Sequence, residues 1–138
     1  MSNTSVACIA FDGKRVFIAH RNPGGQMGDR WEFPGGKVED GETDEDAIVR
    51  EFREEFGVEV KVGAPIAETF FKRNDGMVAL HAYQVFLPHD GLVRRFALSE
   101  HSEYRWAELS EIPALRFVDS DMLIFPFVAK FLADSIPG

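Results

Sequence analysis

The sequence has one cysteine, no long apolar segment and a deficit of positive charge. Cys8 cannot form an intramolecular disulfide, and its apolar neighbours favour a buried small hydrophobe over a nucleophile. No apolar run approaches the about 18 residues that a membrane-spanning helix needs, and no charged N-terminal segment precedes an apolar one. We therefore expect a cytoplasmic protein with neither a secretion signal nor a membrane partner.

The charge balance limits the classes of ligand. The chain has 23 acidic and 15 basic residues and a net charge of −8 at pH 7, which argues against an extended nucleic-acid surface. It leaves room for a small phosphorylated ligand, because bound cations can reverse the local field around acidic side chains. With 138 residues, 45% of them apolar, and no internal repeat or linker, the chain predicts one domain over residues 1–138.

Residues 43–57 carry the signals of a capped amphipathic helix. Thr43 is a suitable N-cap, Asp46 stands three residues later in the position of the capping-box acid, and the helix is expected to begin near Asp44. Gly57 is typical of a helix C-terminus. The expected helix therefore has about a dozen residues.

One stripe of this helix is apolar, and three glutamates lie beside it. At about 100° per residue, the stripe contains Ile48, Val49, Phe52 and Phe56. Glu51 repels both Glu54 and Glu55 across one helical turn, which disfavours the helix unless a divalent cation lies between them. The alternative is a solvated helix in which Arg50 and Arg53 neutralise the acids.

The spacing of the whole segment favours the cation. It follows the pattern Gly, five residues, Glu, seven residues, Arg-Glu-apolar-any-Glu-Glu-any-Gly-apolar, at Gly36, Glu42, Arg50, Glu51, Phe52, Glu54, Glu55, Gly57 and Val58. Seven fixed identities coincide by chance with a probability on the order of 10⁻⁸ per start position. The segment resembles the signature of the Nudix hydrolases, although Phe52 replaces the usual aliphatic residue. The flanking WEFPGGKVEDGET is similar to the MutT branch, which hydrolyses nucleoside triphosphates.

The resemblance implies a metal centre. Its ligands for one to three Mg²⁺ or Mn²⁺ ions would be the side chains of Glu51, Glu54 and Glu55 and the backbone oxygen of Gly35. The family often adds a carboxylate from a later loop, for which Glu100 is the candidate, with Glu103 and His101 as substitutes. The general base is then either Glu51 or Glu100.

Three further residues around the signature are implied as support. Gly36, with Gly35, lets the backbone turn tightly and approach a ligand. Arg50 would orient a glutamate through a charge-assisted hydrogen bond. Glu42 would make an outer-sphere contact or order the loop.

The resemblance also implies a nucleotide pocket. Arg21, at the end of an expected strand, is either a phosphate or base contact or a surface charge. Glu32 and Phe33 precede the glycines and are expected to contact substrate. Asp119 and Asp121 stand where the MutT branch reads an oxidised purine, and both are equally suited to capping the last helix.

The reaction implied is attack of water at the β-phosphorus of a nucleoside triphosphate, which yields a monophosphate and pyrophosphate, with 8-oxo-dGTP as the leading substrate. Other Nudix substrates, an RNA 5′ end and a non-catalytic nucleotide-sensing module remain alternatives. The expected protein is a monomer or a homodimer.

Periodicity completes the predicted fold. Strands are expected over residues 5–11, 15–20, 59–73 and 76–87. His81 and Tyr83 share one strand face, where a structural role is favoured over contact with a ligand. A last helix is expected after residues 119–121, with Phe125, Phe127, Val128, Phe131 and Leu132 facing inward. The element order suggests a sheet with helices on both faces, and the resemblance implies the α/β/α sandwich with a mixed sheet.

Overall fold

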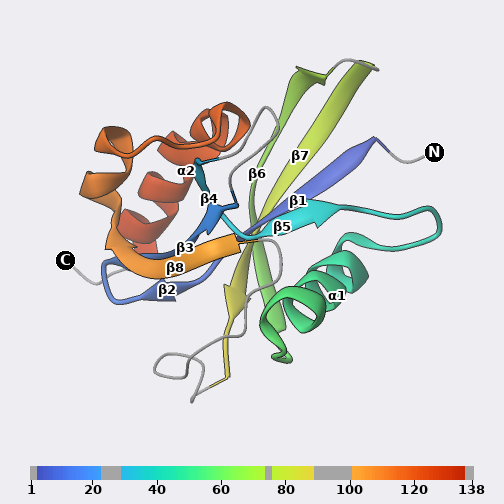
Figure 1. Cartoon of the computed structure of the whole chain (residues 1–138), viewed down its shortest axis with the longest axis horizontal. Helices are drawn as coiled ribbons and strands as arrows, with labels where there is room; N and C mark the ends of the chain where they lie inside the picture. The colour runs from blue at the N-terminus through green and yellow to red at the C-terminus, as the bar shows by residue number, and fades with distance from the viewer. Residues whose placement is uncertain (1–2, 23–28, 74–75, 89–100, 136–138) are drawn as a thin grey trace.

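The computed structural model describes residues 3–22, 29–73, 76–88 and 101–135. Its elements, in chain order, are β1 (Thr4–Ile9), β2 (Phe11–Asp12), β3 (Arg15–Arg21), β4 (Trp31–Glu32), β5 (Gly35–Lys37), α1 (Asp44–Phe56), β6 (Lys61–Arg73), β7 (Gly76–Phe86), β8 (His101–Glu108), the 3₁₀ helix η2 (Leu109–Ala114) and α2 (Asp119–Ser135). Figure 1 shows α1 and α2 on opposite sides of the strands. The α/β sandwich and its two helical layers are thus as predicted.

The strands form two sheets where the sequence predicted one. The first has the order β5-β1-β7-β6, in which β1 and β7 are parallel and the other pairs antiparallel, so it is mixed as expected. In the second, β3 lies between β4 and β8 and also pairs with β2, always antiparallel. The expected strand over residues 5–11 is therefore wrong in its bounds, because the chain leaves the first sheet after Ile9 and enters the second at Phe11.

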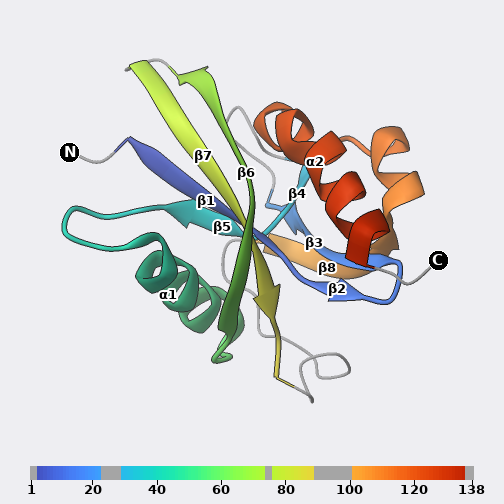
Figure 2. The same ribbon diagram turned by 180° about the vertical axis from the view of Figure 1, so that it is seen from behind.

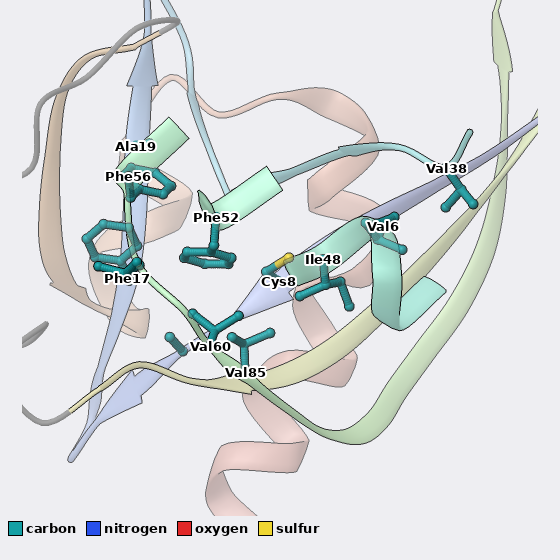
Figure 3. Close-up of a cluster of buried hydrophobic side chains, with 13 residues drawn as sticks. Val6, Cys8, Phe17, Ala19, Val38, Ile48, Phe52, Phe56, Val60 and Val85 are labelled. Carbon is teal, nitrogen blue, oxygen red and sulfur yellow. The ribbon is translucent and has the colours of Figure 1, made fainter. Parts of the chain in front are cut away.

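The side chains of β1 alternate between the two helical layers. Val6 and Cys8 pack with Ile48 and Phe52 of α1, and Figure 3 shows Ile48 and Phe52 directed toward Cys8. Ala7 and Ile9 belong to a second cluster that contains Ile124 and Val128 of α2. Because successive side chains of a strand face opposite sides, one short strand anchors both helices.

The last helix differs from its prediction. It begins at Asp119, and Pro126 lies inside it, at its eighth residue. Val128 and Leu132 are buried as expected, whereas Phe127 is 52% exposed and was wrongly placed in the core. Residues one apart lie about 100° apart on a helix, so Phe127 falls beside the buried stripe.

None of the helices in the described ranges is both long and apolar enough to traverse a bilayer.

Candidate active site

Local signals fix both ends of α1. The Thr43 hydroxyl accepts a hydrogen bond from the backbone N–H of Asp46 at 3.1 Å, as the sequence predicted. Gly57 closes the helix in the left-handed region, with φ at 67°, and its N–H donates to the carbonyl of Arg53. The helix therefore presents its glutamates at defined positions.

Two glycines of β5 bring the backbone against α1 and β1. A Cβ on Gly36 would lie 2.4 Å from Oε1 of Glu51, so the missing side chain makes room for this carboxylate. A Cβ on Gly35 would lie 1.9 Å from the carbonyl oxygen of Val6, and its φ of 153° favours glycine. The glycines therefore allow close contact with the chain's own strand and glutamate, and the approach of a ligand expected at them stays a prediction.

Arg50 joins the helix to the loop that precedes it. Its Nε and Nη2 donate to the two oxygens of Glu42 at 2.8 and 3.0 Å, and Nη2 also donates to the carbonyl of Lys37 at 2.9 Å. Its Nη1 donates to Oε1 of Glu51 at 3.0 Å and lies 3.5 Å from Glu54. Bidentate pairing of this kind sets direction as well as attraction.

Glu42 is held in its charged form by this network. The hydrogen bond from Arg50 lowers the pKa of the Glu42 carboxyl, and the backbone N–H of Glu39 adds a bond at 3.0 Å. The same bond to Glu42 raises the pKa of Arg50. Of the two roles predicted for Glu42, ordering the loop is the one with contacts in the structure.

The three signature glutamates have different environments. The side chain of Glu54 is 63% exposed, that of Glu51 is 20% exposed, and Glu55 is buried. No group of three His, Cys, Asp or Glu side chains is arranged to enclose an ion within the described ranges. The donors are nonetheless all hard oxygens on one helix beside a glycine backbone, which fits Mg²⁺ or Mn²⁺ by chemistry.

A cleft of about 320 Å³ connects this region to α2. Besides Glu51, six residues predicted for the metal or nucleotide site or for its support line the cleft: Arg21, Glu32, Phe33, Gly35, Gly36 and Asp121. The structure thus brings the signature helix and the predicted nucleotide residues to one place. Arg50, Glu42, Glu54, Glu55 and Asp119 are outside its lining, and Glu100 lies outside the described residues.

Asp121 is the most buried charged group of the cleft. Its Oδ2 accepts the backbone N–H of Phe33 at 2.9 Å, although 88 positions separate the two residues. Burial, followed by the nearby charge of Glu32, raises the pKa of Asp121 to about 8. Its carboxyl bonds the backbone between β4 and β5 and not its own helix, so the capping alternative is wrong for Asp121.

Arg21 and Asp119 both form ion pairs, in different settings. Nη1 of Arg21 lies 3.2 Å from Oε2 of Glu32 inside the cleft, so Arg21 is more than an isolated surface charge. Asp119 is the first residue of α2, and its 87% exposed side chain pairs with Arg30 at 3.3 Å. The equivalence that the sequence suggested between Asp119 and Asp121 does not hold.

Sequence reasoning missed the wall that β6 contributes to the cleft. Phe71 and Arg73 line it, with the guanidinium of Arg73 5.3 Å from the centre of the Phe71 ring. Leu80 of β7 lies beside them. The period of two along β6 places Phe71 and Arg73 on one face, and this alternation is the signal that could have identified them.

A second polar cluster ties the start of α1 to β7. Nδ1 of His81 lies 2.6 Å from Oδ2 of Asp44, and the hydroxyl of Tyr83 donates to the same oxygen at 2.7 Å. Nε2 of His81 lies 2.7 Å from Oε2 of Glu68 on β6. Burial, with the Asp44 bond, raises the pKa of Tyr83 to about 12. These contacts agree with the structural role favoured for His81 and Tyr83, and contact of either side chain with a ligand stays a prediction.

Known proteins share both the sequence pattern and the fold. Residues 1–126 match the model of the NUDIX domain. The CTP pyrophosphohydrolase of Escherichia coli K12 is 32% identical over 133 residues, which cover 96% of this chain and 93% of that protein. The 8-oxo-dGTP diphosphatase of Proteus vulgaris is 58% identical over a local stretch of 45 residues, 33% of this chain and 40% of that protein. The solution structure of the mismatch repair protein MutT from methicillin-resistant Staphylococcus aureus 252, of the Nudix hydrolase family, superposes with a TM-score of 0.70 at 30% identity, covering 97% of this chain and 99% of that one.

Proposed function

Since this chain belongs to the NUDIX domain family and is a Nudix hydrolase of phosphoanhydride bonds, we propose that it converts a nucleoside triphosphate into a monophosphate and pyrophosphate with Mg²⁺. The observation that carries the proposal is the cleft in which Glu51 and the two glycines face Arg21, Glu32 and Asp121. One end offers carboxylate and backbone oxygen, and the other offers groups that can bind phosphate or base.

The metal end is assigned to the signature residues. Glu51, Glu54, Glu55 and the carbonyl of Gly35 would hold the ion or ions. When bound, Mg²⁺ neutralises phosphate oxygens and lowers the pKa of the attacking water. Mn²⁺ has a similar preference for oxygen ligands and is the expected substitute.

Arg50 and Glu42 keep the metal end ordered. Arg50 holds one oxygen of Glu51 at 3.0 Å, and Glu42 fixes Arg50 by two hydrogen bonds. This arrangement orients the carboxylate of Glu51, which lines the cleft. The general base is assigned to Glu51 or Glu100, the two carboxylates that the sequence identified.

The nucleotide end is assigned to Arg21, Glu32, Phe33 and Asp121. The carboxylate of Glu32 accepts hydrogen bonds, which suits an exocyclic amino group such as that of cytosine or guanine. With a pKa of about 8, Asp121 is largely protonated at neutral pH and can offer an O–H donor as well as an acceptor. Asp119, exposed and outside the cleft lining, is given no role in base selection.

Two bases are the leading candidates. Similarity to a CTP pyrophosphohydrolase over almost the whole chain supports a cytosine nucleotide. Local similarity to an 8-oxo-dGTP diphosphatase, together with the MutT-like signature, supports an oxidised purine nucleotide. The polar groups of the cleft suit either base, so direct competition between the two substrates is required.

Product analysis tests the reaction. The enzyme is incubated with Mg²⁺ in ¹⁸O-labelled water and a panel containing CTP, dCTP, 8-oxo-dGTP, the common triphosphates and a 5′-triphosphate RNA. Attack at the β-phosphorus places ¹⁸O in pyrophosphate, whereas attack at the α-phosphorus places it in the monophosphate. Release of inorganic phosphate and a diphosphate would contradict the proposal.

Variants connect the activity to the site. Glu54→Gln is expected to lower kcat at least 10²-fold, because a ligand carboxylate becomes a neutral amide. Glu59→Gln is the control, since Glu59 is exposed and pairs with Arg53 near the C-terminal end of the helix. Tight Mg²⁺-dependent binding of one nucleotide without turnover would favour the sensing module, and preference for RNA would favour the RNA 5′-end alternative.

A further inference from the structure

β6 forms an edge of the mixed sheet. It has 13 residues, pairs with β7 on one side and has no strand on its other side within the ranges that the structure describes. In Figure 2 it runs in front of the other strands of its sheet, with α1 on one side and α2 on the other. A long edge of this kind presents unpaired N–H and C=O groups to any strand that can align with them.

Only the second half of β6 can form a regular ladder. Its pairing with β7 shifts register between Val62 and Pro65 and again between Pro65 and Ala67. A proline lacks the N–H that a ladder needs, and bulges turn an edge away from partners. From Ala67 to Arg73 the pairing with β7 is continuous. This half of β6 therefore has neither a proline nor a bulge to keep another strand from pairing with it.

The open half exposes an acidic, an aromatic and a basic side chain on one face. Glu68, Phe70 and Lys72 are exposed and alternate with the less exposed Thr69 and Phe71. Phe70 is 56% exposed, and Met77, opposite Lys72 on β7, is 55% exposed. Large apolar side chains on an open edge mark it as a pairing surface.

We propose that a second copy of this chain pairs with β6 in antiparallel orientation, about a two-fold axis at Phe70. This register places Phe70 opposite the partner's Phe70 and Glu68 opposite the partner's Lys72. By symmetry Lys72 faces the partner's Glu68, so the interface contains two opposite-charge pairs around an aromatic pair.

The charges select this register. Moving the axis to Thr69 would place Glu68 opposite the partner's Phe70, and moving it to Phe71 would place Phe70 opposite the partner's Lys72. Either shift loses both charge pairs and the contact between the two Phe70 rings. Glu68 can pair with the partner's Lys72 and also with His81, because a carboxylate has two oxygens that accept and its Oε2 lies 2.7 Å from Nε2 of the imidazole.

The ladder is short, so the dimer is expected to be reversible. A few residues from each copy bury less than the about 800 Å² per partner of a standard stable interface. We expect sedimentation velocity of the full chain to show a dimer whose fraction rises with protein concentration. A chain that stays monomeric up to the highest soluble concentration would overturn the proposal.

A disulfide probe tests the axis. Opposite Cα atoms in an antiparallel pair are about 4.5 to 5.5 Å apart, which is within reach of a disulfide. Under mild oxidation Phe70→Cys should form a covalent dimer, while the buried native Cys8 gives little background. Phe86→Cys is the control, because Phe86 is similarly exposed but lies at the other end of the hairpin. Equal cross-linking of both variants would refute the register.

Charge reversal tests the pairing by rescue. Lys72→Glu and Glu68→Lys should each shift the protein toward monomer, because they place like charges across the interface. The double variant Glu68→Lys/Lys72→Glu should recover dimer, since opposite charges again face one another. Lys130→Glu on α2 is the control and should not change the dimer fraction. Failure of the double variant to recover dimer, with folded protein by circular dichroism, would contradict the proposal.

Discussion

Nδ1 of His81 lies 2.6 Å from Oδ2 of Asp44, and this contact joins the middle of β7 to the first residue of the helix that carries the signature glutamates. The hydroxyl of Tyr83 binds the same carboxylate oxygen. The N-terminus of α1 is therefore held laterally by a sheet as well as by its own cap at Thr43.

Removing either partner of this carboxylate should destabilise the protein. Tyr83→Phe deletes one hydrogen bond and is expected to lower the free energy of unfolding by about 0.5–1.5 kcal/mol. His81→Ala leaves the part-buried carboxylate of Asp44 and the exposed carboxylate of Glu68 without the imidazole, and it should cost about 1–3 kcal/mol. Urea denaturation measures both values, with Glu68→Gln as a control that keeps an acceptor for His81. Unchanged unfolding of His81→Ala would show that the cluster does not hold the helix.

Asp121 should make stability depend on pH near neutrality. The pKa of Asp121 in the folded protein, about 8, lies above its ordinary value of 3.8. The contribution of the protonated carboxyl to the free energy of unfolding is therefore fully present below about pH 4 and is lost as pH rises toward 8. Asp121→Asn keeps an acceptor for the N–H of Phe33 but cannot ionise. Relative to the native chain, the variant should gain up to about 1.4 kcal/mol per pH unit over this window. Urea denaturation between pH 5 and 9 measures the difference, and parallel stability curves would contradict the assignment.

The two glycines of β5 should separate stability from activity. Gly36→Ala places a Cβ against the end of the flexible Glu51 side chain, so the fold should survive while the carboxylate moves. A misplacement of this size can lower kcat on the order of 10²-fold. Gly35→Ala collides with the backbone carbonyl of Val6 and should instead unfold the protein at lower temperature. Melting temperature and kcat, measured on both variants, distinguish the effects, and the reverse pattern would exclude the proposed packing.

Arg50→Lys should be damaging although the charge is kept. Lysine cannot reproduce the paired bonds to Glu42 or reach Lys37 and Glu51 together. We expect kcat to fall by at least about tenfold with a smaller change in KM, because a positioning group is lost. Glu42→Gln should also lower kcat. The loss in the double variant should be smaller than the two single losses combined, since both changes break one network. Additive losses would mean that the two residues act independently.

Local chemistry explains why the sequence identified α1 so closely. Thr43 and Gly57 act on backbone groups within one turn, and Ile48, Phe52 and Phe56 repeat with the helical period, so the signals and the structure they specify occupy the same fifteen residues. Local sequence signals do not predict the break at Ala10, where the chain passes from one sheet to the other. Nothing in the apolar run over residues 5–11 distinguishes one strand from two, because the choice depends on which strands are available to pair.

The sequence by itself therefore determined the family, the capped helix, its three glutamates and the glycines beside it, because spacing within a short segment carries that information. The tertiary structure decided which of two neighbouring aspartates enters the cleft. Asp119 is in solvent and Asp121 is buried against Phe33, 88 positions away in the chain. It also decided that Phe71 and Arg73 form a wall of the site. Contacts between residues so distant in sequence exist only after the sheets and α2 have packed, and burial then sets the chemistry of the groups they enclose.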